Sequence, residues 1–99
     1  MKPNLGIISQ LRELDRVLSD CALKIELIKD IKHPGVVSIS TNFVVLNEMS
    51  ETIQEDFRAG RINKHDVQKI RFINELKRKS EDLNRIIDMA SNDLLSQNT

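Results

Sequence analysis

Few residues in this sequence are of the types that perform covalent or metal chemistry. The chain has two histidines, His33 and His65, and one cysteine, Cys21. A single cysteine excludes an intramolecular disulfide and any zinc site built on paired cysteines, and the histidines do not stand at a metal-ligand spacing. His65 and Asp66 are neighbours, but successive helical residues project about 100° apart, so their side chains diverge. With no glycine-rich phosphate loop and no nucleophile elbow, we expect no enzyme, no metal and no cofactor.

The spacing of the apolar side chains predicts the elements that hold these residues. From residue 7 onward, apolar residues recur at alternating steps of four and three, the heptad pattern of a helix that packs against other helices. They are Ile7, Leu11, Leu14, Leu18, Cys21, Ile25 and Ile28. The pattern predicts a first helix over about residues 5–32, ended by His33-Pro34-Gly35 because proline disfavours helical geometry in the residue before it. We expect Cys21 to be a core residue and His33 a solvated residue at the helix C-terminus.

A second helix is predicted over about residues 41–59. The residues before it, Val36–Ser40, are expected to form an extended connector, and Ser40 or Thr41 to cap the helix. One face of the helix is apolar and the other is acidic. Gly60 follows, in the position where glycine commonly ends a helix.

A third helix is predicted over about residues 63–95. Asn63 is expected to be its N-cap and Asp66 the partner in a capping box, with Ile62 and Val67 forming a hydrophobic staple. His65 then lies exposed in the first turn. A second heptad-like seam follows, in which a serine occupies position 80. Its apolar members are Ile73, Leu76, Leu83, Ile87 and Leu94.

These segments predict one all-α domain over residues 1–99, an elongated bundle of three helices with coiled-coil-like seams and frayed ends at 1–4 and 96–99. The third helix is about 45–50 Å long, whereas a compact chain of this length has a radius of gyration of about 13 Å. Either the bundle is elongated or a second chain buries the helix ends. Two heptad seams favour the second alternative, so we predict a homodimer or higher oligomer. The seam residues expected to meet a partner are Ile7, Leu11, Leu14, Leu18, Ile25, Ile28, Ile73, Leu76, Leu83, Ile87 and Leu94.

Charge is segregated along the chain although the net charge is zero. Residues 47–57 carry four acids and no base, and residues 58–79 carry eight bases and two acids. The bases are Arg58, Arg61, Lys64, Lys69, Arg71, Lys77, Arg78 and Lys79. They form either a docking surface for phosphate or an acidic protein face, or a solvated helix face partly neutralised by the acidic second helix. The zero net charge makes nucleic acid a possible partner but not the favoured one.

No apolar run is long enough to span a bilayer, and polar residues interrupt the N-terminal region where a signal peptide needs an apolar segment. The sequence therefore predicts a cytoplasmic protein with no membrane partner.

The corner between the second and third helices resembles a known helical hairpin. Glu55-Asp56-Phe57-Arg58-Ala59-Gly60-Arg61-Ile62-Asn63, with Asp66 and then Ile70, Ile73, Leu76, Leu83 and Ile87, is similar to the C-terminal hairpin of small phage-encoded transcription regulators. The resemblance covers about residues 42–90. Those regulators usually carry a helix-turn-helix DNA reader before the hairpin, where this chain has a single long heptad helix.

The resemblance implies a phage or prophage regulator that lacks a DNA reader, and small prophage antirepressors act by occupying a repressor. We therefore expect a non-enzymatic helical protein-interaction module that binds another regulatory protein, such as a transcriptional repressor. Two alternatives are a DNA-binding regulator that uses the basic start of the third helix, and a structural or chaperone-like subunit of a larger assembly.

Overall fold

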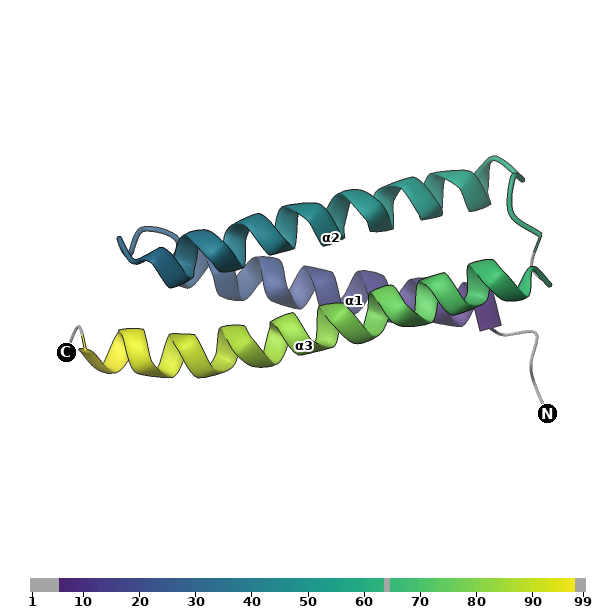
Figure 1. Ribbon diagram of the computed structural model, residues 1–99. Helices are drawn as coiled ribbons and strands as arrows, with labels where there is room; N and C mark the ends of the chain where they lie inside the picture. Colours follow the sequence, from purple (N-terminus) through teal and green to yellow (C-terminus); the bar gives the residue numbers. More distant parts are fainter. Residues whose placement is uncertain (1–5, 64, 98–99) are drawn as a thin grey trace.

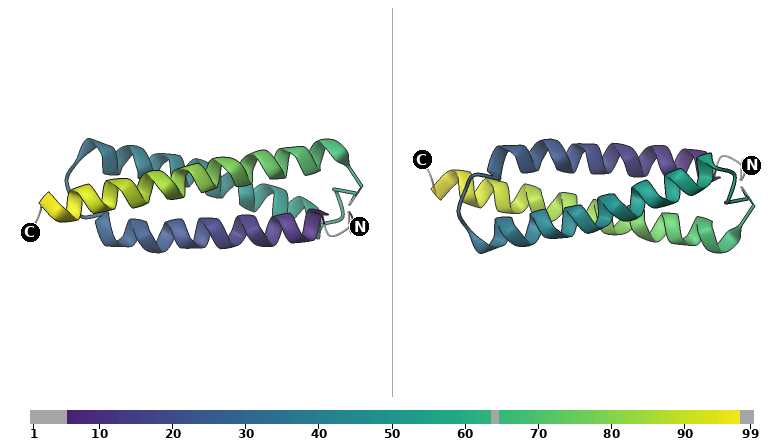
Figure 2. Two further views of the ribbon diagram at one scale, coloured as in Figure 1. Left: turned by 90° about the horizontal axis from the view of Figure 1, so that it is seen from below. Right: turned by 90° about the horizontal axis from the view of Figure 1, so that it is seen from above.

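The protein is a bundle of three long helices. The computed structural model describes residues 6–63 and 65–97. Its elements are α1 (Gly6–Ile28), α2 (Pro34–Arg58) and α3 (Val67–Gln97), with no strand among the described residues. The chain runs up, down and up, so α1 and α3 are parallel and α2 is antiparallel to both (Figures 1 and 2). The bundle measures 50 × 26 × 17 Å, which confirms the predicted all-α, elongated architecture.

Both predicted seams lie inside this single chain. Ten of the eleven seam residues are buried, and Ile25 is partly buried. They pack α1 against α3, with apolar residues of α2 closing the core; Cys21 is also buried there, as predicted. The seams expected to meet a partner chain therefore serve as the intrachain core, because the three helices cover one another's apolar stripes. Of the two alternatives posed by the helix length, the structure shows the elongated bundle.

The core is divided near its middle by a buried serine. One apolar cluster contains Ile53, and the other contains Leu46; Ser50 lies between these two positions on α2 and is 2% exposed. Its hydroxyl oxygen accepts a hydrogen bond of 2.8 Å from Nε2 of Gln54. The buried Ser80 hydroxyl donates to the Leu76 carbonyl oxygen at 2.8 Å. Both serines are therefore satisfied locally, as buried polar groups must be.

The predicted connector before the second helix is wrong. α2 begins at Pro34 rather than near residue 41, and α1 ends at Ile28 rather than near residue 32. Proline is well suited to the first helical position because its missing N–H has no intrahelical acceptor there. His33 is the N-cap of α2, and its Nδ1 accepts a hydrogen bond of 2.9 Å from the Gly35 amide. It thus caps the start of the second helix instead of lying at the end of the first.

The early start of α2 has a packing reason as well. Val36 and Ile39, placed in the predicted connector, are 3% and 4% exposed in the core. They continue the apolar stripe of α2 back toward its N-terminus at helical spacing. An extended connector would not present both side chains to the bundle in this way.

Gly60 ends α2 as predicted. Its φ is 76°, and the Gly60 amide donates to the Phe57 carbonyl oxygen at 3.1 Å. The Arg61 amide donates to the Asp56 carbonyl oxygen at 2.8 Å. This pair of bonds is the Schellman motif, which requires a left-handed residue just after the helix.

The predicted capping of α3 is wrong in its register. Asp66, not Asn63, precedes the helix, and its Oδ1 accepts from the Lys69 amide at 3.2 Å. Asn63 instead accepts from the His65 amide at 2.8 Å, which forms an Asx turn before the helix and leaves His65 outside the first turn. Ile62 is 6% exposed in the core but Val67 is 61% exposed, so the expected staple between them is absent. The helix therefore starts four residues later than predicted.

Candidate protein-interaction site

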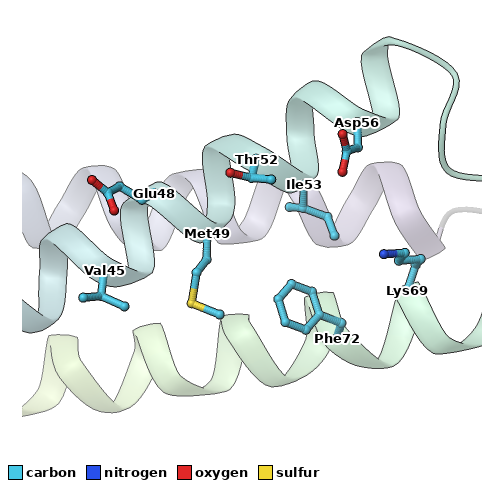
Figure 3. Close-up of a pocket in the computed structure, with 8 residues that line it drawn as sticks. All are labelled: Val45, Glu48, Met49, Thr52, Ile53, Asp56, Lys69 and Phe72. Carbon is cyan, nitrogen blue, oxygen red and sulfur yellow. The ribbon is translucent and has the colours of Figure 1, made fainter.

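An apolar groove lies between α2 and α3. It consists of two hollows of about 430 and 270 Å³ that share Val45. The first hollow is lined by Val45, Glu48, Met49, Thr52, Ile53, Asp56, Lys69 and Phe72 (Figure 3). The second is lined by Asn42, Val45, Leu46, Lys79, Asp82, Leu83 and Ile86. The groove therefore extends along the middle of the α2–α3 hairpin.

Large apolar side chains border this groove and remain accessible to solvent. Val45 and Met49 of α2 are 51% and 37% exposed, and Phe72 and Ile86 of α3 are 40% and 52% exposed. Met49 points from α2 toward α3, beside the ring of Phe72 (Figure 3). Each of these four residues adjoins the buried stripe of its helix, so the groove is an apolar margin that the bundle does not cover.

Charges of opposite sign stand on the two edges of the groove. α2 contributes Glu48 and Asp56, and α3 contributes Lys69 and Lys79. Asp56 already forms an ion pair with Arg61, in which Oδ1 of Asp56 lies 2.8 Å from Nη1 of Arg61. Among the described residues, no ion pair within 4.0 Å involves Glu48, Lys69 or Lys79. The groove thus has an acidic edge on α2 and a basic edge on α3.

Asp82 is the one acid that α3 adds to the groove, and it forms an ion pair with Arg85 of the same helix. This pair partly offsets the charge of Asp82, as the pair with Arg61 does for Asp56, and the two lysines leave the α3 edge with a net positive charge.

The predicted basic docking residues have different surroundings. Lys69 and Lys79 line the groove, whereas Arg78 pairs with Glu75 of its own helix. Lys77 is half-buried and close enough to Glu13 to help lower the pKa of that carboxyl, after the larger effect of Arg16.

The other four basic positions lie outside the groove or outside the described residues. Arg58 and Arg71 are exposed, on the last turn of α2 and the early part of α3. Arg61 is at the corner, bonded to Asp56, and Lys64 lies outside the described residues.

A polar network joins α1 to α3 on another side of the bundle. Nζ of Lys24 is 3.2 Å from Asp20 Oδ2 and 2.7 Å from Asp88 Oδ1, and it donates to Asn84 Oδ1 at 3.0 Å. Nδ2 of Asn84 donates to Asp20 at 3.1 Å. The hydrogen bonds from Asn84 and Lys24 lower the pKa of Asp20, and the bond to Asp88 raises the pKa of Lys24. These groups hold the two helices together.

The cysteine is inert in this fold. Burial raises the pKa of Cys21 to about 11, so the thiol stays protonated at neutral pH. Its Sγ donates weakly to the Ser80 carbonyl oxygen at 3.8 Å. Among the described residues, no three His, Cys, Asp or Glu side chains gather as metal ligands. None of the described helices is long and apolar enough to cross a membrane.

Comparisons with protein-family models, curated proteins and solved structures found no significant match.

The sequence prediction named Lys69, Lys79 and Leu83, but it did not single out the exposed apolar residues of the groove. A signal was present, because Val45, Phe72 and Ile86 each adjoin a residue of the apolar stripe of their own helix, at positions 46, 73 and 87. One residue along a helix is a rotation of about 100°, which moves the side chain to the margin of the buried stripe. A pair of adjacent apolar residues therefore indicates the edge of the buried stripe of a helix. Whether the second residue of the pair is buried depends on how the neighbouring helices pack.

Proposed function

We propose that this protein is a non-enzymatic helical protein-interaction module that binds a helix of another protein in the α2/α3 groove. The single observation that carries the proposal is the groove itself. It combines four exposed large apolar side chains with a base formed by the buried Leu46, Ile53 and Leu83. Exposed apolar patches of this kind on small proteins commonly mark interaction surfaces.

The dimensions of the groove support a helical ligand. Phe72 and Ile86 are fourteen residues apart on α3, so they span about 21 Å at 1.5 Å per residue. That length corresponds to about four turns of helix. An amphipathic helix lying between α2 and α3 would present apolar residues at steps of three and four, as helices do in hydrophobic grooves of other proteins.

We further propose that the bound protein is a regulatory protein such as a transcriptional repressor, and that the module acts as a phage or prophage regulator of the antirepressor kind. The support is the resemblance of residues 42–90 to the hairpin of small phage-encoded regulators. The groove lies on the same α2–α3 hairpin. A regulator of this kind works in the cytoplasm, where its repressor is.

Site-specific photocrosslinking tests the proposal. A photoreactive amino acid is placed at Val45 in the groove, or at Leu23 on the outer face of α1, which is 69% exposed. The variants are expressed in the cells that make the protein. We expect a discrete adduct with another protein from position 45 and not from position 23, identified by mass spectrometry. The identified partner should then bind the purified parent protein and lose binding to Val45→Glu. If position 45 gives no heterologous adduct beyond those from position 23, the proposed function is wrong.

A further inference from the structure

We propose that the α2/α3 groove also pairs with the groove of a second copy of this chain, so that α2 of each copy lies over α3 of the other. The two-fold axis of this dimer runs along the groove. The inference rests on the proposed function, because it takes the groove to be an interaction surface, and it adds the identity of one partner and the geometry of the pairing.

The apolar side chains of the groove suit self-association. α2 offers Val45 and Met49, and α3 offers Phe72 and Ile86. When α2 faces α3 of the second copy, the unbranched Met49 lies within about 6 Å of the level of Phe72 of the second copy and meets this larger side chain instead of a second methionine. Methionine adapts readily to such contacts and packs well against aromatic rings. Dimerisation therefore removes these four apolar side chains of each copy from water.

The charges on the two edges match across the same axis. Asp56 and Lys69 both line the first hollow, and Figure 3 shows them toward the same end of it, at a similar level of the antiparallel α2–α3 pair. From Asp56 back to Glu48 is about 12 Å along α2, and from Lys69 forward to Lys79 is about 15 Å along α3. Glu48 and Lys79 therefore also lie within about 3 Å of a common level.

A rotation about an axis along the groove keeps every residue at its level and exchanges the two edges. Glu48 then faces Lys79 of the second copy, and Asp56 faces Lys69 of the second copy. Each attraction occurs twice, as the symmetry requires. Glu48, Lys69 and Lys79 have no ion pair within the described part of one chain, so this contact gives them opposite charges.

The other face-to-face arrangement places like charges together. With the axis across the helices, α2 lies over α2 of the second copy and α3 over α3. Glu48 and Asp56 would then approach acids, and Lys69 and Lys79 would approach bases. Like-charge contacts of this kind oppose association. The charge pattern thus selects the axis along the bundle.

The size of the face indicates a weak dimer. From Lys69 to Ile86 the face is about 26 Å long, and two adjacent helices are about 20 Å wide. Each copy then buries about 500 Å², or about 1,000 Å² in total, at the lower limit of specific interfaces. The net charge of the chain is zero, so no overall repulsion opposes the pairing. We expect dissociation in the micromolar range and dimer only at high protein concentration.

Sedimentation velocity over a dilution series from low to high micromolar protein tests the inference at low ionic strength. The parent protein should shift from monomer to dimer as its concentration rises. Val45→Glu places a charge in the groove and should remain monomeric. Leu23→Glu, at a comparably exposed apolar position away from the groove, should dimerise like the parent. Circular dichroism checks that both variants keep the parent's helical content.

Charge reversal tests the axis. Glu48→Lys alone and Lys79→Glu alone should each weaken the dimer several-fold, because each creates two like-charge contacts. The double variant with both changes should restore the parent's dissociation constant. Single variants that dimerise as well as the parent would overturn the axis proposed here.

The outcomes separate this inference from the proposed function. A parent protein that is monomeric at every concentration overturns the dimer, as does a dimer that Val45→Glu leaves intact. If the photocrosslinker at position 45 still captures another protein in those cases, the proposed function stands. If it captures none, both are wrong.

Discussion

Replacing Gly60 with alanine should destabilise the protein through the backbone alone. Gly60 has a φ of 76°, and a Cβ built at this position meets no heavy atom within 4 Å. No clash therefore contributes to the cost. The left-handed conformation itself costs an L-residue about 1–2 kcal/mol. The chain cannot relax cheaply from it, because two hydrogen bonds that end α2 depend on it.

We expect Gly60→Ala to lower the free energy of unfolding by about 1–2 kcal/mol, with a fall in Tm of about 4–8 °C for each kcal/mol. Gly60→Asn should lose less, because asparagine tolerates the left-handed region. Gly60→Val should lose more, because a β-branched residue is a strong outlier there. The order Asn, Ala, Val of increasing loss is the signature of backbone strain.

Urea unfolding followed by circular dichroism measures these differences. Gly35→Ala is the control: Gly35 lies in the first turn of α2 without a positive φ, and its new Cβ would be 3.1 Å from Nδ1 of the exposed His33. That side chain can shift at the expense of its bond to the Gly35 amide, and alanine is the better helix former, so the control should lose less stability than Gly60→Ala. Equal stability of the three Gly60 variants and the parent, or a valine variant more stable than the alanine one, would refute the reasoning.

Three further predictions concern the capping, pH dependence and core of the bundle. His33→Ala removes the side-chain acceptor at the N-cap of α2 and should lower the free energy of unfolding, measured with urea, by about 1 kcal/mol. His33→Asn keeps a side-chain acceptor and should retain most of that free energy. The pKa of Asp20 is lowered from 3.8 by hydrogen bonds, so its stabilising effect is complete above that value and is lost as the pH falls through the lower folded-state pKa. The urea midpoint should therefore drop on acidification below about pH 4, and less so in Asp20→Asn. Ile73→Ala should cost about 2–5 kcal/mol because Ile73 is fully buried, while Val67→Ala, 61% exposed in the parent, should stay within about 0.5 kcal/mol.

The long helices could be predicted from the sequence because their apolar residues keep a helical period without interruption. The steps of four and three from Ile7 to Ile28 leave no other regular structure that would bury these residues together. Gly60 was predictable for a related reason, since few residues other than glycine tolerate the conformation that closes a Schellman motif.

The start of α2 was not predictable from residue preferences alone. Proline is compatible both with the end of a preceding helix and with the start of a following one. Pro34 alone therefore does not determine whether the residues after it form a connector or the first turns of α2. The burial of Val36 and Ile39 decides the matter, and it depends on contacts with residues distant in sequence. The cap of α3 was ambiguous in the same way, because Asn63 and Asp66 are both good N-caps and the chain uses the second.

The groove was the least predictable feature, and it changes where a partner should be sought. The heptad seams had indicated a dimer because each seam needs a neighbouring helix, but α1 and α3 supply that neighbour to each other. Any interface between two copies must therefore lie elsewhere on the surface. Leu23 and Leu27 of α1 are also exposed, but they line neither hollow of the α2/α3 groove. The α2/α3 groove differs because two helices contribute apolar side chains to one concave surface and opposite charges to its edges. An interface that combines buried apolar contact with matched charges is the kind that selects a partner and fixes its orientation. Both proposals made for this protein consequently depend on the same few side chains, and Val45 is the position at which they are most directly tested.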